Sequence, residues 1–440
     1  HPPGGRGMTK HRVDLLLEPF DTLFFRDARP MQAGAGSGGH GARWPLPVTL
    51  HSALRTALLT DDGSLPRRKA VMVRRVRKDR EVTSTVGDTR FDHVRLQGGL
   101  PWCDGRPYFP VPADLAPAKK SDKQSPACIP LRPLRQGLGI TNFPAPWLHP
   151  VGAYVPATKE KLPSWVDGGF LQTYLGWSGS EELTPPDFSE PWTVEHRYGI
   201  QINAETRTVV ESAFYVAEHL RLYEGAGIWV ALECNASDEE ATDALNRLAA
   251  GGALTVGGEG RACRTKQMLD VPLPEPVVRG NRVKWVLSSP AVFDGGWRPG
   301  WVDPADGKVK LRRNLARNPA ETRLAWRERM KTAPEIGARL VAVCAGKPFA
   351  FSGWEVLGGT AAEERAGNGS GAGTPRSTQL AVPAGSVYYF EADSEADARI
   401  LAEALHGRCH SDRLGEKGFG WGFCGTWDWL EPFWGPEGTQ

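Results

Sequence analysis

Two glycine-rich loops with basic neighbours are the segments of this 440-residue sequence best suited to hold a phosphate. They read VGGEGR at 256–261 and GEKGFGWG at 415–422. Glycine lets backbone N–H groups approach a phosphate closely. A single loop of this kind often only turns a strand, but two equivalent loops, each with a cation, favour anion binding. The candidate contacts in them are Gly257, Gly258, Gly260, Arg261, Lys417, Gly418, Phe419, Gly420 and Trp421.

Neither loop has the sequence of a nucleotide-hydrolysing site. No G-x-x-x-x-G-K-[ST] is present, and neither loop opens a helix, as a dinucleotide fingerprint must. Nucleotide hydrolysis is therefore not expected, and no cofactor is predicted.

Further basic residues lie in a glycine-rich connection at 24–58 and in a predicted hairpin at about 196–216. The connection runs from a strand to a helix and can wrap an RNA backbone. In the hairpin, RYGIQI and RTVVESAFYV flank a turn at 203–205, with Arg197 at the base and Arg207 at the tip. The candidate RNA contacts in the two segments are Arg26, Arg29, Arg43, His51, Arg55, Arg197 and Arg207.

Four aromatic residues are candidate platforms for base stacking: Phe24, Phe25, Phe419 and Trp421. Single-stranded RNA is bound by basic grooves and by stacking of bases on aromatic rings or Arg planes. The alternative for each ring is core packing, which is favoured for Phe24 because it follows a first strand.

An internal resemblance between 225–262 and 384–422 predicts the elements that position the loops. Each segment predicts a strand, a helix with an acidic first turn, and the glycine loop. Ser237 is the predicted N-cap of the first helix, and Ser394, with Asp397 three residues on, that of the second. The predicted buried faces are Ala241, Leu245, Leu248 and Ala249, and Ala396, Ile400, Leu401 and Leu405.

A matching strand and helix precede each repeat: LLLEPFDTLFF with VTLHSALRTALL, and VKWVLSSPAVF with a helical stretch near 319–332. With the strand-like runs RTVVESAFYV and RLVAVCA, each half can be assembled as βαββαβ. In this ferredoxin-like (RRM-like) pattern two helices cover one face of an antiparallel sheet and leave the other face free. The predicted fold class is α+β, with two such domains in tandem at 8–272 and 273–440.

Two long stretches fall outside this predicted core. Residues 357–385, rich in Gly, Ala, Ser and Thr, predict a mobile loop. Residues 98–195 are dense in proline and tryptophan and predict an insertion that packs on a partner. Residues 1–7 are interpreted as a tag remnant or short extension. The tryptophans of the insertion are Trp102, Trp147, Trp165, Trp177 and Trp192.

Composition supports a globular protein of more than one domain. Net charge is only +2, from 53 basic and 51 acidic residues, but eight basic residues and one acid lie between 67 and 80. Such a stretch suits a polyanion as well as a solvated loop. The seven scattered cysteines contain no C-x-x-C, and no run approaches the ~20 apolar residues of a membrane helix. A soluble, cytoplasmic protein is therefore expected.

Five landmarks across the chain resemble a known family, the third subunit of the Cmr complex, a type III-B CRISPR effector of the RAMP superfamily. They are LEPFDTLFFRDARPMQAG at 17–34, WPLPVTLHSALRTALL at 44–59, RYGIQINAETRTVVESAFYVAEHLRL at 197–222, VGGEGR at 256–261 and GEKGFGWG at 415–422. The first two are specific to that family, whereas glycine loops are shared by RAMP proteins generally. The chain departs from the family in its longer AGAGSGGHGA stretch and in the 357–385 segment.

The resemblance implies a non-catalytic subunit that binds the repeat-derived 5′ tag of crRNA and carries a β-hairpin thumb. It also implies that the chain caps the backbone filament beside the large polymerase-like subunit and meets target RNA only indirectly. Target cleavage and cyclic oligonucleotide synthesis would belong to other subunits. No membrane partner is implied.

Three rival interpretations stay open on the sequence. A crRNA-processing RAMP endoribonuclease would use His51, with His40 or His196 as a second proton-transfer group. A zinc site could be built from His406, Cys409, His410 and Cys424, although they lack paired ligand spacing, and no metal is predicted. A scaffold protein would dock through the tryptophan-rich insertion without touching RNA.

Overall fold

The computed structural model describes residues 10–26, 42–60, 69–71, 84–86, 90–118, 127–135, 143, 145–154, 158, 161–179, 182–185, 190–314, 318, 321–356, 373–375 and 377–431. It is a mixed α/β structure, rich in strands, with one large sheet in each half of the chain. The helices are α1 (Pro47–Thr60), α2 (Gly168–Gly176), α3 (Glu239–Ala249), α4 (Arg323–Lys331), α6 (Glu395–Leu405) and the 3-10 turn η1 (Gly415–Lys417).

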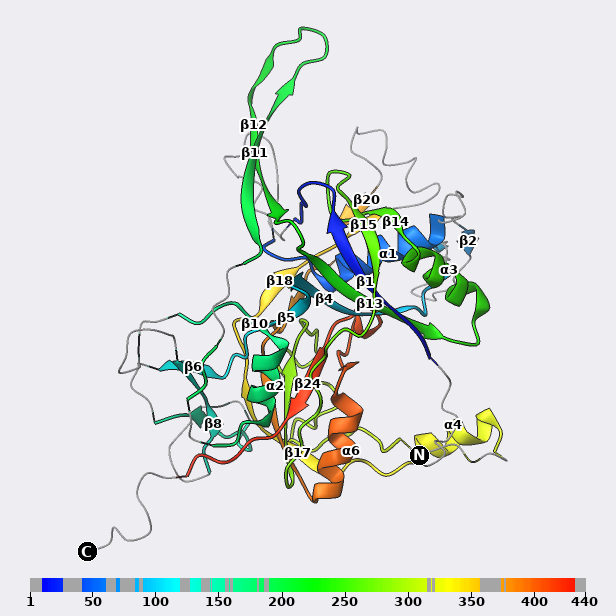
Figure 1. The fold of residues 1–440 in the computed structure, drawn as a ribbon. Helices are drawn as coiled ribbons and strands as arrows, with labels where there is room; N and C mark the ends of the chain where they lie inside the picture. Colours follow the sequence, from blue (N-terminus) through cyan, green and yellow to red (C-terminus); the bar gives the residue numbers. More distant parts are fainter. Residues whose placement is uncertain are drawn as a thin grey trace, which may run out of the picture.

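The first sheet has seven strands in the order β10-β5-β4-β13-β1-β15-β14 (Figure 1). Its four central strands, β4, β13, β1 and β15, pair antiparallel throughout. In chain order they follow the pattern strand, helix, strand, strand, helix, strand, with α1 after β1 and α3 after β13. The strand bounds are β1 (Lys10–Pro19), β4 (Arg95–Cys103), β5 (Arg106–Pro110), β10 (Trp165–Asp167), β13 (Gly227–Asn235), β14 (Gly252–Thr255) and β15 (Ala262–Met268).

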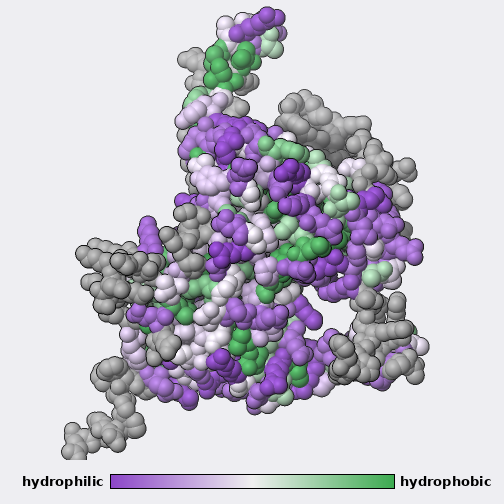
Figure 2. All heavy atoms as spheres, viewed as in Figure 1, coloured by the Kyte–Doolittle hydropathy of each residue, from purple (hydrophilic) through white to green (hydrophobic). Residues whose placement is uncertain are grey.

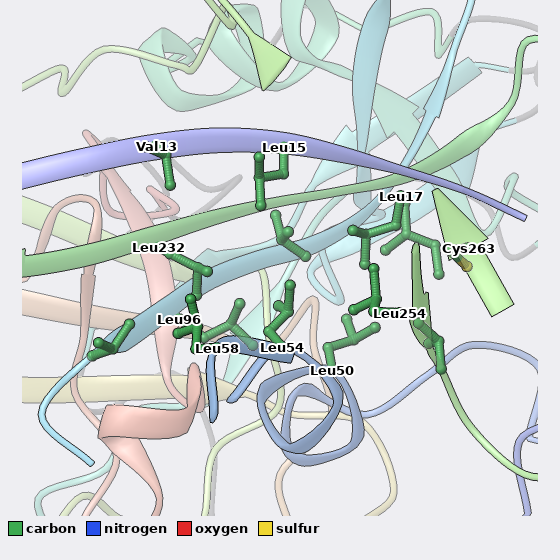
Figure 3. Close-up of a cluster of buried hydrophobic side chains, with 14 of the residues drawn as sticks. Val13, Leu15, Leu17, Leu50, Leu54, Leu58, Leu96, Leu232, Leu254 and Cys263 are labelled. Atoms are coloured by element: carbon green, nitrogen blue, oxygen red, sulfur yellow. The ribbon is translucent and has the colours of Figure 1, made fainter. Parts of the chain in front are cut away.

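Helices α1 and α3 cover one face of this sheet because each carries an apolar stripe at helical spacing. In α1, Leu50, Leu54 and Leu58 are buried at successive turns and point towards the sheet, with Leu58 beside Leu96 of β4 and Leu50 below Leu17 of β1 (Figure 3). In α3 the predicted buried face holds for Ala241, Leu245 and Ala249, with Leu248 partly buried. The predicted Ser237 cap is wrong by one residue, because the Asp238 carboxylate accepts the bond from the Ala241 N–H, 3.0 Å away.

The second sheet has five strands in the order β17-β22-β16-β24-β23, again antiparallel. Helix α6 packs on it and begins at Ser394, as predicted, since the Ser394 hydroxyl accepts from the Asp397 N–H at 3.1 Å. Leu401 and Leu405 are buried as predicted, but Ala396 is exposed. The strand bounds are β16 (Arg282–Leu287), β17 (Ala338–Cys344), β22 (Val387–Ala392), β23 (Arg408–Cys409) and β24 (Trp421–Gly425).

The predicted helix near 319–332 exists as α4 but does not cover the second sheet. None of its described side chains is buried, and Leu324 is 70% exposed. The apolar cluster that contains the buried face of α6 includes instead residues that precede and follow α4 in the chain, among them Val302, Val309 and Ile336. The local helical propensity was therefore sufficient for α4 to form, but α4 does not pack on the second sheet.

The prediction of a free sheet face is wrong. Leu16 and Trp229 of the first sheet share one buried cluster with Val286 and Phe423 of the second, and Trp229 lies 5.8 Å from the Trp421 ring. Helix α2 joins this cluster through Leu171, Tyr174 and Leu175. The faces left by the helices thus bury each other and the insertion, because two half-covered apolar sheets lose exposed area by packing together.

The insertion begins later than predicted and packs on the chain itself. Residues 95–103, part of which the sequence placed in the insertion, form core strand β4. Its QGGLPWC sequence resembles a turn because Gly98 and Gly99, both with positive φ, bulge the strand around the Trp229 ring. Trp102, Trp177 and Trp192 are buried within the protein, so these rings are not a surface for a partner.

The remaining strands form small two-stranded sheets, among them a long hairpin of β11 (Trp192–Ile202) and β12 (Val209–Leu222) that projects from the body (Figure 1). It is longer than the predicted 196–216. The end of the predicted mobile loop also pairs, since β21 joins β18, whereas 357–372 and 376 lie outside the described residues. The other strands are β2 (Lys69–Val71), β3 (Ser84–Val86), β6 (Leu115–Ala118), β7 (Ala127–Pro130), β8 (Arg132–Pro133), β9 (Val151–Gly152), β18 (Phe349–Phe351), β19 (Trp354–Val356), β20 (Gly373–Pro375) and β21 (Gln379–Ala381).

All seven cysteines are free thiols. Burial raises the pKa of Cys128, Cys263, Cys344 and Cys409 to about 12, so these thiols stay protonated. Among the described helices, none has the length and apolar character required to cross a membrane.

Candidate functional site

Three arginines from three parts of the chain converge on one carboxylate at the base of the hairpin. Arg197 of β11 donates to Asp21 at 2.9 Å, Arg221 of β12 at 3.1 Å, and Arg261 of the first glycine loop at 3.2 Å. Asp21 lies in the bend that follows β1. The structure therefore brings together Arg197 and Arg261, two predicted contacts, and adds Arg221, which the sequence analysis missed.

Two glutamates complete this network. Glu195 accepts from the Nε of Arg197 at 2.8 Å and from the Nε of Arg221 at 2.5 Å, and Glu259 accepts from Arg261 at 3.4 Å. The hydrogen bond from Arg197 is the main cause that lowers the pKa of Asp21, and the bond from Arg221 that of Glu195. Both acids are therefore ionised at neutral pH. Three guanidinium charges are balanced by three carboxylates.

His219 lies beneath the network with its side chain fully buried. Its Nδ1 is 3.0 Å from the Thr22 hydroxyl, its Nε2 is 3.2 Å from the Glu259 carboxylate, and Phe24 stacks on its ring at 5.0 Å. Burial lowers the pKa of His219, so the imidazole is neutral near pH 7. Phe24 and Phe25 are only 3% and 4% exposed, so the core alternative holds for both and neither stacks on a base.

The first glycine loop is glycine-rich for an internal reason. A Cβ on Gly257, which has φ +80°, would lie 2.4 Å from the Phe24 carbonyl oxygen, and the Gly258 N–H already donates to that oxygen at 2.8 Å. The prediction that Gly257 and Gly258 cradle a phosphate is therefore not supported, since this close approach occupies them. Gly260, with φ +63° and open space around it, remains a candidate.

This difference between the glycines predicts different costs of substitution. Gly257→Ala should lower the free energy of unfolding by about 1–3 kcal/mol more than Gly260→Ala, because only Gly257 meets the Phe24 backbone. Both variants share the left-handed backbone cost of about 1–2 kcal/mol, so Gly260→Ala is the matched control. Urea unfolding measures the difference, and equal losses would contradict the packing role.

The second glycine loop lies in the core between the two halves. A Cβ on Gly418 would lie 3.2 Å from the Leu96 carbonyl oxygen, and one on Gly420 would lie 2.6 Å from the Ser411 nitrogen. Phe419 and Trp421 are 0% exposed. The predicted stacking on RNA by these two rings is wrong, because they fill the clusters that join the loop to the rest of the protein.

Lys417 lies beside α1 rather than beside the arginine network. Its charge, with that of Arg55, adds to burial in lowering the pKa of His51. His51 is 6% exposed and its Nε2 lies 3.4 Å from the Val94 carbonyl oxygen, while Arg55 pairs with Asp92 at 2.6 Å. The prediction that His51 contacts RNA directly is therefore wrong for this structure.

Three other predicted contacts are spread over the surface. Arg26 lies before residues 27–41 and Arg43 lies after them, and both are exposed. Arg207 is exposed at the tip of the hairpin and has φ +53°. Arg29 and His40 lie outside the described residues, as does most of the basic stretch 67–80. Among the described residues, Arg207 is separated from the arginine network by the length of the hairpin.

The hairpin carries an apolar face that the sequence analysis missed. Tyr198 is 70% exposed, Ile200 51% and Phe214 55%, and the Tyr198 and Phe214 rings stack at 5.9 Å. Ile200 lies directly opposite Phe214 and Tyr198 directly opposite Val216, which places these side chains on one face of the hairpin. Figure 2 shows apolar residues gathered on the hairpin below its hydrophilic tip. Apolar residues occupy alternate positions in the second half of β11, and this pattern in the sequence could have predicted the apolar face.

The two histidines of the predicted alternative zinc site, His406 and His410, form hydrogen bonds with backbone groups. His406 Nδ1 accepts from the Cys424 N–H at 3.1 Å and its Nε2 bonds the Pro274 carbonyl oxygen at 3.0 Å, while His410 Nε2 bonds the Ala404 carbonyl oxygen at 2.7 Å. Within the described ranges, no group of three His, Cys, Asp or Glu side chains is arranged to hold a metal ion.

Residues 15–427 match the family model described as CRISPR-associated protein (Cas_Cmr3). A search of curated proteins gave no significant match. Among solved structures, a chain of the type III-B Cmr-beta complex bound to cognate target RNA is 14% identical, with 92% of this chain and 95% of that chain covered and a TM-score of 0.39.

A second structure of Cmr-beta, bound to cognate target RNA and AMPPnP in state 1, is 13% identical over 92% of this chain and 94% of that chain, with a TM-score of 0.40. Both the sequence identities and the TM-scores are low, so the family assignment rests on the family model alone. The family match itself spans nearly the whole chain. This protein therefore belongs to the Cas_Cmr3 family of CRISPR-associated proteins, as the sequence resemblance predicted.

Proposed function

We propose that this chain is a non-catalytic subunit of a type III-B Cmr effector ribonucleoprotein, in which it captures the 5′ repeat-derived tag of crRNA. It would cap the backbone filament next to the large polymerase-like subunit, in antiviral defence against foreign RNA and transcribed DNA. The observation that carries the proposal is the Cas_Cmr3 match over residues 15–427. In this proposal the chain is cytoplasmic, contacts a backbone Cmr subunit, and meets target RNA only through the crRNA.

The architecture proposed with it is a tandem of two ferredoxin-like RAMP domains, 8–272 and 273–440, with the hairpin as a thumb. Two observations support it. The four central strands of the first sheet and the four strands β17-β22-β16-β24 of the second have the same order relative to chain order, and the proposed boundary falls between β15 and β16. The absence of a docked α4 makes the second domain the less regular of the two.

The hairpin and its base form the proposed RNA surface. Single-stranded RNA binds where unstacked bases find aromatic faces and phosphates find arginines. Tyr198 and Phe214 offer exposed rings on one hairpin face, and Arg197, Arg221 and Arg261 lie at its base. Phosphates and bases of one strand can therefore be bound along a single projecting element.

The same geometry disfavours the endoribonuclease alternative. A general base must come within about 3 Å of the ribose 2′-hydroxyl. His51 is buried under the first sheet, and His196 lies on the projecting hairpin, 3.8 Å from Glu218. The two histidines lie on different elements, α1 and β11, and do not share a site.

A photoreactive base placed in the 5′ tag of crRNA tests the proposal in the reconstituted effector complex. Adducts are expected at 192–222, at 20–26 and at 256–261, because these segments form the hairpin and its base. Peptide mapping by mass spectrometry locates them, and a photoreactive base at the 3′ end is the matched control. Adducts confined to other subunits would leave this chain a scaffold and overturn the proposal.

A further inference from the structure

The Asp21 carboxylate sits at the point where three guanidiniums meet. Its Oδ2 accepts from Arg197 and Arg261, and its Oδ1 accepts from Arg221. The three arginines come from two hairpin strands and a separate loop, and among the described residues Asp21 is the one carboxylate that all three share. Convergence of several guanidiniums on two oxygens of one negative group is the arrangement with which proteins bind phosphate.

An RNA phosphodiester is a close match for a carboxylate at such a point. It carries a single negative charge and two unesterified oxygens, and both can accept from arginine N–H groups. We propose that Asp21 occupies a phosphate position in the RNA-free protein, and that a crRNA phosphodiester displaces it from Arg197, Arg221 and Arg261. This inference rests on the proposed function and concerns the regulation of that same surface.

The local structure allows Asp21 to leave. Its side chain is 45% exposed, and its neighbour Phe20 is 64% exposed, while the chain is anchored on both sides by β1 and by the backbone pairing of Leu23 with Leu220. Rotation of the Asp21 side chain into solvent would break only its bonds to the arginines. The core beneath would keep its packing.

Glu195 has a different part in the network. It bridges the Nε atoms of Arg197 and Arg221 from a position on the same hairpin, at 2.8 and 2.5 Å. These bonds fix the planes of the two guanidiniums relative to the hairpin. Glu195 is thus a positioning residue, whereas Asp21 is the exchangeable anion.

Charge and hydrogen-bond accounting support the exchange. The three arginines are balanced by Asp21, Glu195 and Glu259, so the network has no net positive charge to offer a phosphate while Asp21 is in place. In the described part of the chain, the Nε of Arg261 is also buried without a hydrogen-bond partner. An unsatisfied buried donor is costly, and a ligand oxygen near it would relieve that cost.

Binding of a tagged crRNA strand to the purified full-length chain, measured over a series of salt concentrations, tests the inference. Asp21→Asn should tighten binding about five- to tenfold, because the competing charge is gone while the shape is kept. The slope of log K against log salt should steepen by about 0.7, the value for one more neutralised phosphate on a single strand. Glu195→Gln should weaken binding instead.

Glu18→Gln is the matched control, since Glu18 pairs with Arg264 at 2.5 Å and takes no part in the network. It should leave the affinity within about twofold of the starting protein, because a remote surface charge acts weakly through salt. If Asp21→Asn does not fold, Asp21→Ser provides the same test. Thermal shift with inorganic pyrophosphate gives a readout without RNA, and the shift should be larger for the Asp21 variant.

Unchanged or weaker binding by the Asp21 variants would overturn the inference and make Asp21 a second positioning residue. The joint variant Arg197→Glu with Arg261→Glu separates this outcome from failure of the proposed function. If that variant loses crRNA affinity while Asp21→Asn does not gain it, only the inference fails. If charge reversal changes nothing, the arginine network does not bind crRNA and both ideas fail together.

Discussion

Replacing Lys284 by Met should destabilise the protein by about 3–5 kcal/mol, the cost of leaving one charge of a buried pair without its partner. Lys284 is 1% exposed and Asp114 is 0% exposed. The Lys284 ammonium donates to the Tyr174 carbonyl oxygen at 2.8 Å and lies 3.6 Å from the centre of the Tyr174 ring. Asp114 accepts from the Tyr174 and Tyr389 hydroxyls at 2.7 and 2.6 Å.

This buried group joins three parts of the fold. Asp114 belongs to the insertion, Tyr174 to α2, and Lys284 and Tyr389 to the second sheet. Loss of the ammonium leaves the Asp114 carboxylate in the apolar cluster between the two halves, where its charged form is no longer compensated. The measurement is urea unfolding of the full-length variant.

A double-mutant cycle isolates the pair. Lys284→Met combined with Asp114→Asn should lose about 1–3 kcal/mol less than the sum of the two single losses, because the second change removes the unpaired charge. Lys266→Met is the control, since Lys266 is exposed on β15. Additive losses would show that the two charges do not interact.

The pH dependence of stability provides a second readout of Lys284. Burial lowers the pKa of Lys284 to about 8, below the ~10.4 of an unfolded lysine. Between these two values the unfolded chain binds more protons than the folded protein, so the contribution of Lys284 to stability increases with pH. Lys284→Met should lose this increase between about pH 8 and pH 10, and a variant that keeps it would contradict the assignment.

Removal of the two exposed hairpin rings should weaken crRNA binding strongly while leaving stability nearly unchanged. Stacking contributes about 1–3 kcal/mol per base, so Tyr198→Ala with Phe214→Ala should raise the Kd for tagged crRNA by about 30-fold or more. Both rings lie on the hairpin, which projects from the body (Figure 1), and both are more than half exposed, so their loss removes little core packing. Fluorescence anisotropy with a labelled tag measures the effect.

The matched control for this pair is Tyr154→Ala, because Tyr154 is 54% exposed but lies on another part of the surface. Its affinity should equal that of the starting protein. A thermal midpoint within about 2 °C would show that the hairpin variant is folded, since surface changes cost little stability. Unchanged affinity of the folded hairpin variant would remove the stacking role from this face.

Local patterns in the sequence predicted the elements of the repeat with good accuracy. The spacing of Ala241, Leu245 and Ala249, one helical turn apart, and the Ser394 cap concern residues a few positions apart, so helices α3 and α6 were found near their observed bounds. The hairpin was predicted for the same reason. Of the candidate site, Arg197 and Arg261 were named as RNA contacts in two separate segments, and their binding to RNA stays a prediction; that they meet at Asp21 was not predicted.

Contacts between distant segments could not be predicted in this way. Phe419 and Trp421 stand between glycines, which resembles an exposed loop, but they are buried because the second sheet and the first sheet pack face to face. The sequence of strand β4 resembles a turn because of its glycines. The structure shows that Gly98 is required where the Trp229 ring of the neighbouring strand lies against it. Asp21 and Arg221, 200 positions apart, meet only because the hairpin returns to the end of β1. Periodicity and capping act over one or two turns of chain, whereas the partner of each apolar face and of each charge is set by the packing of the whole molecule.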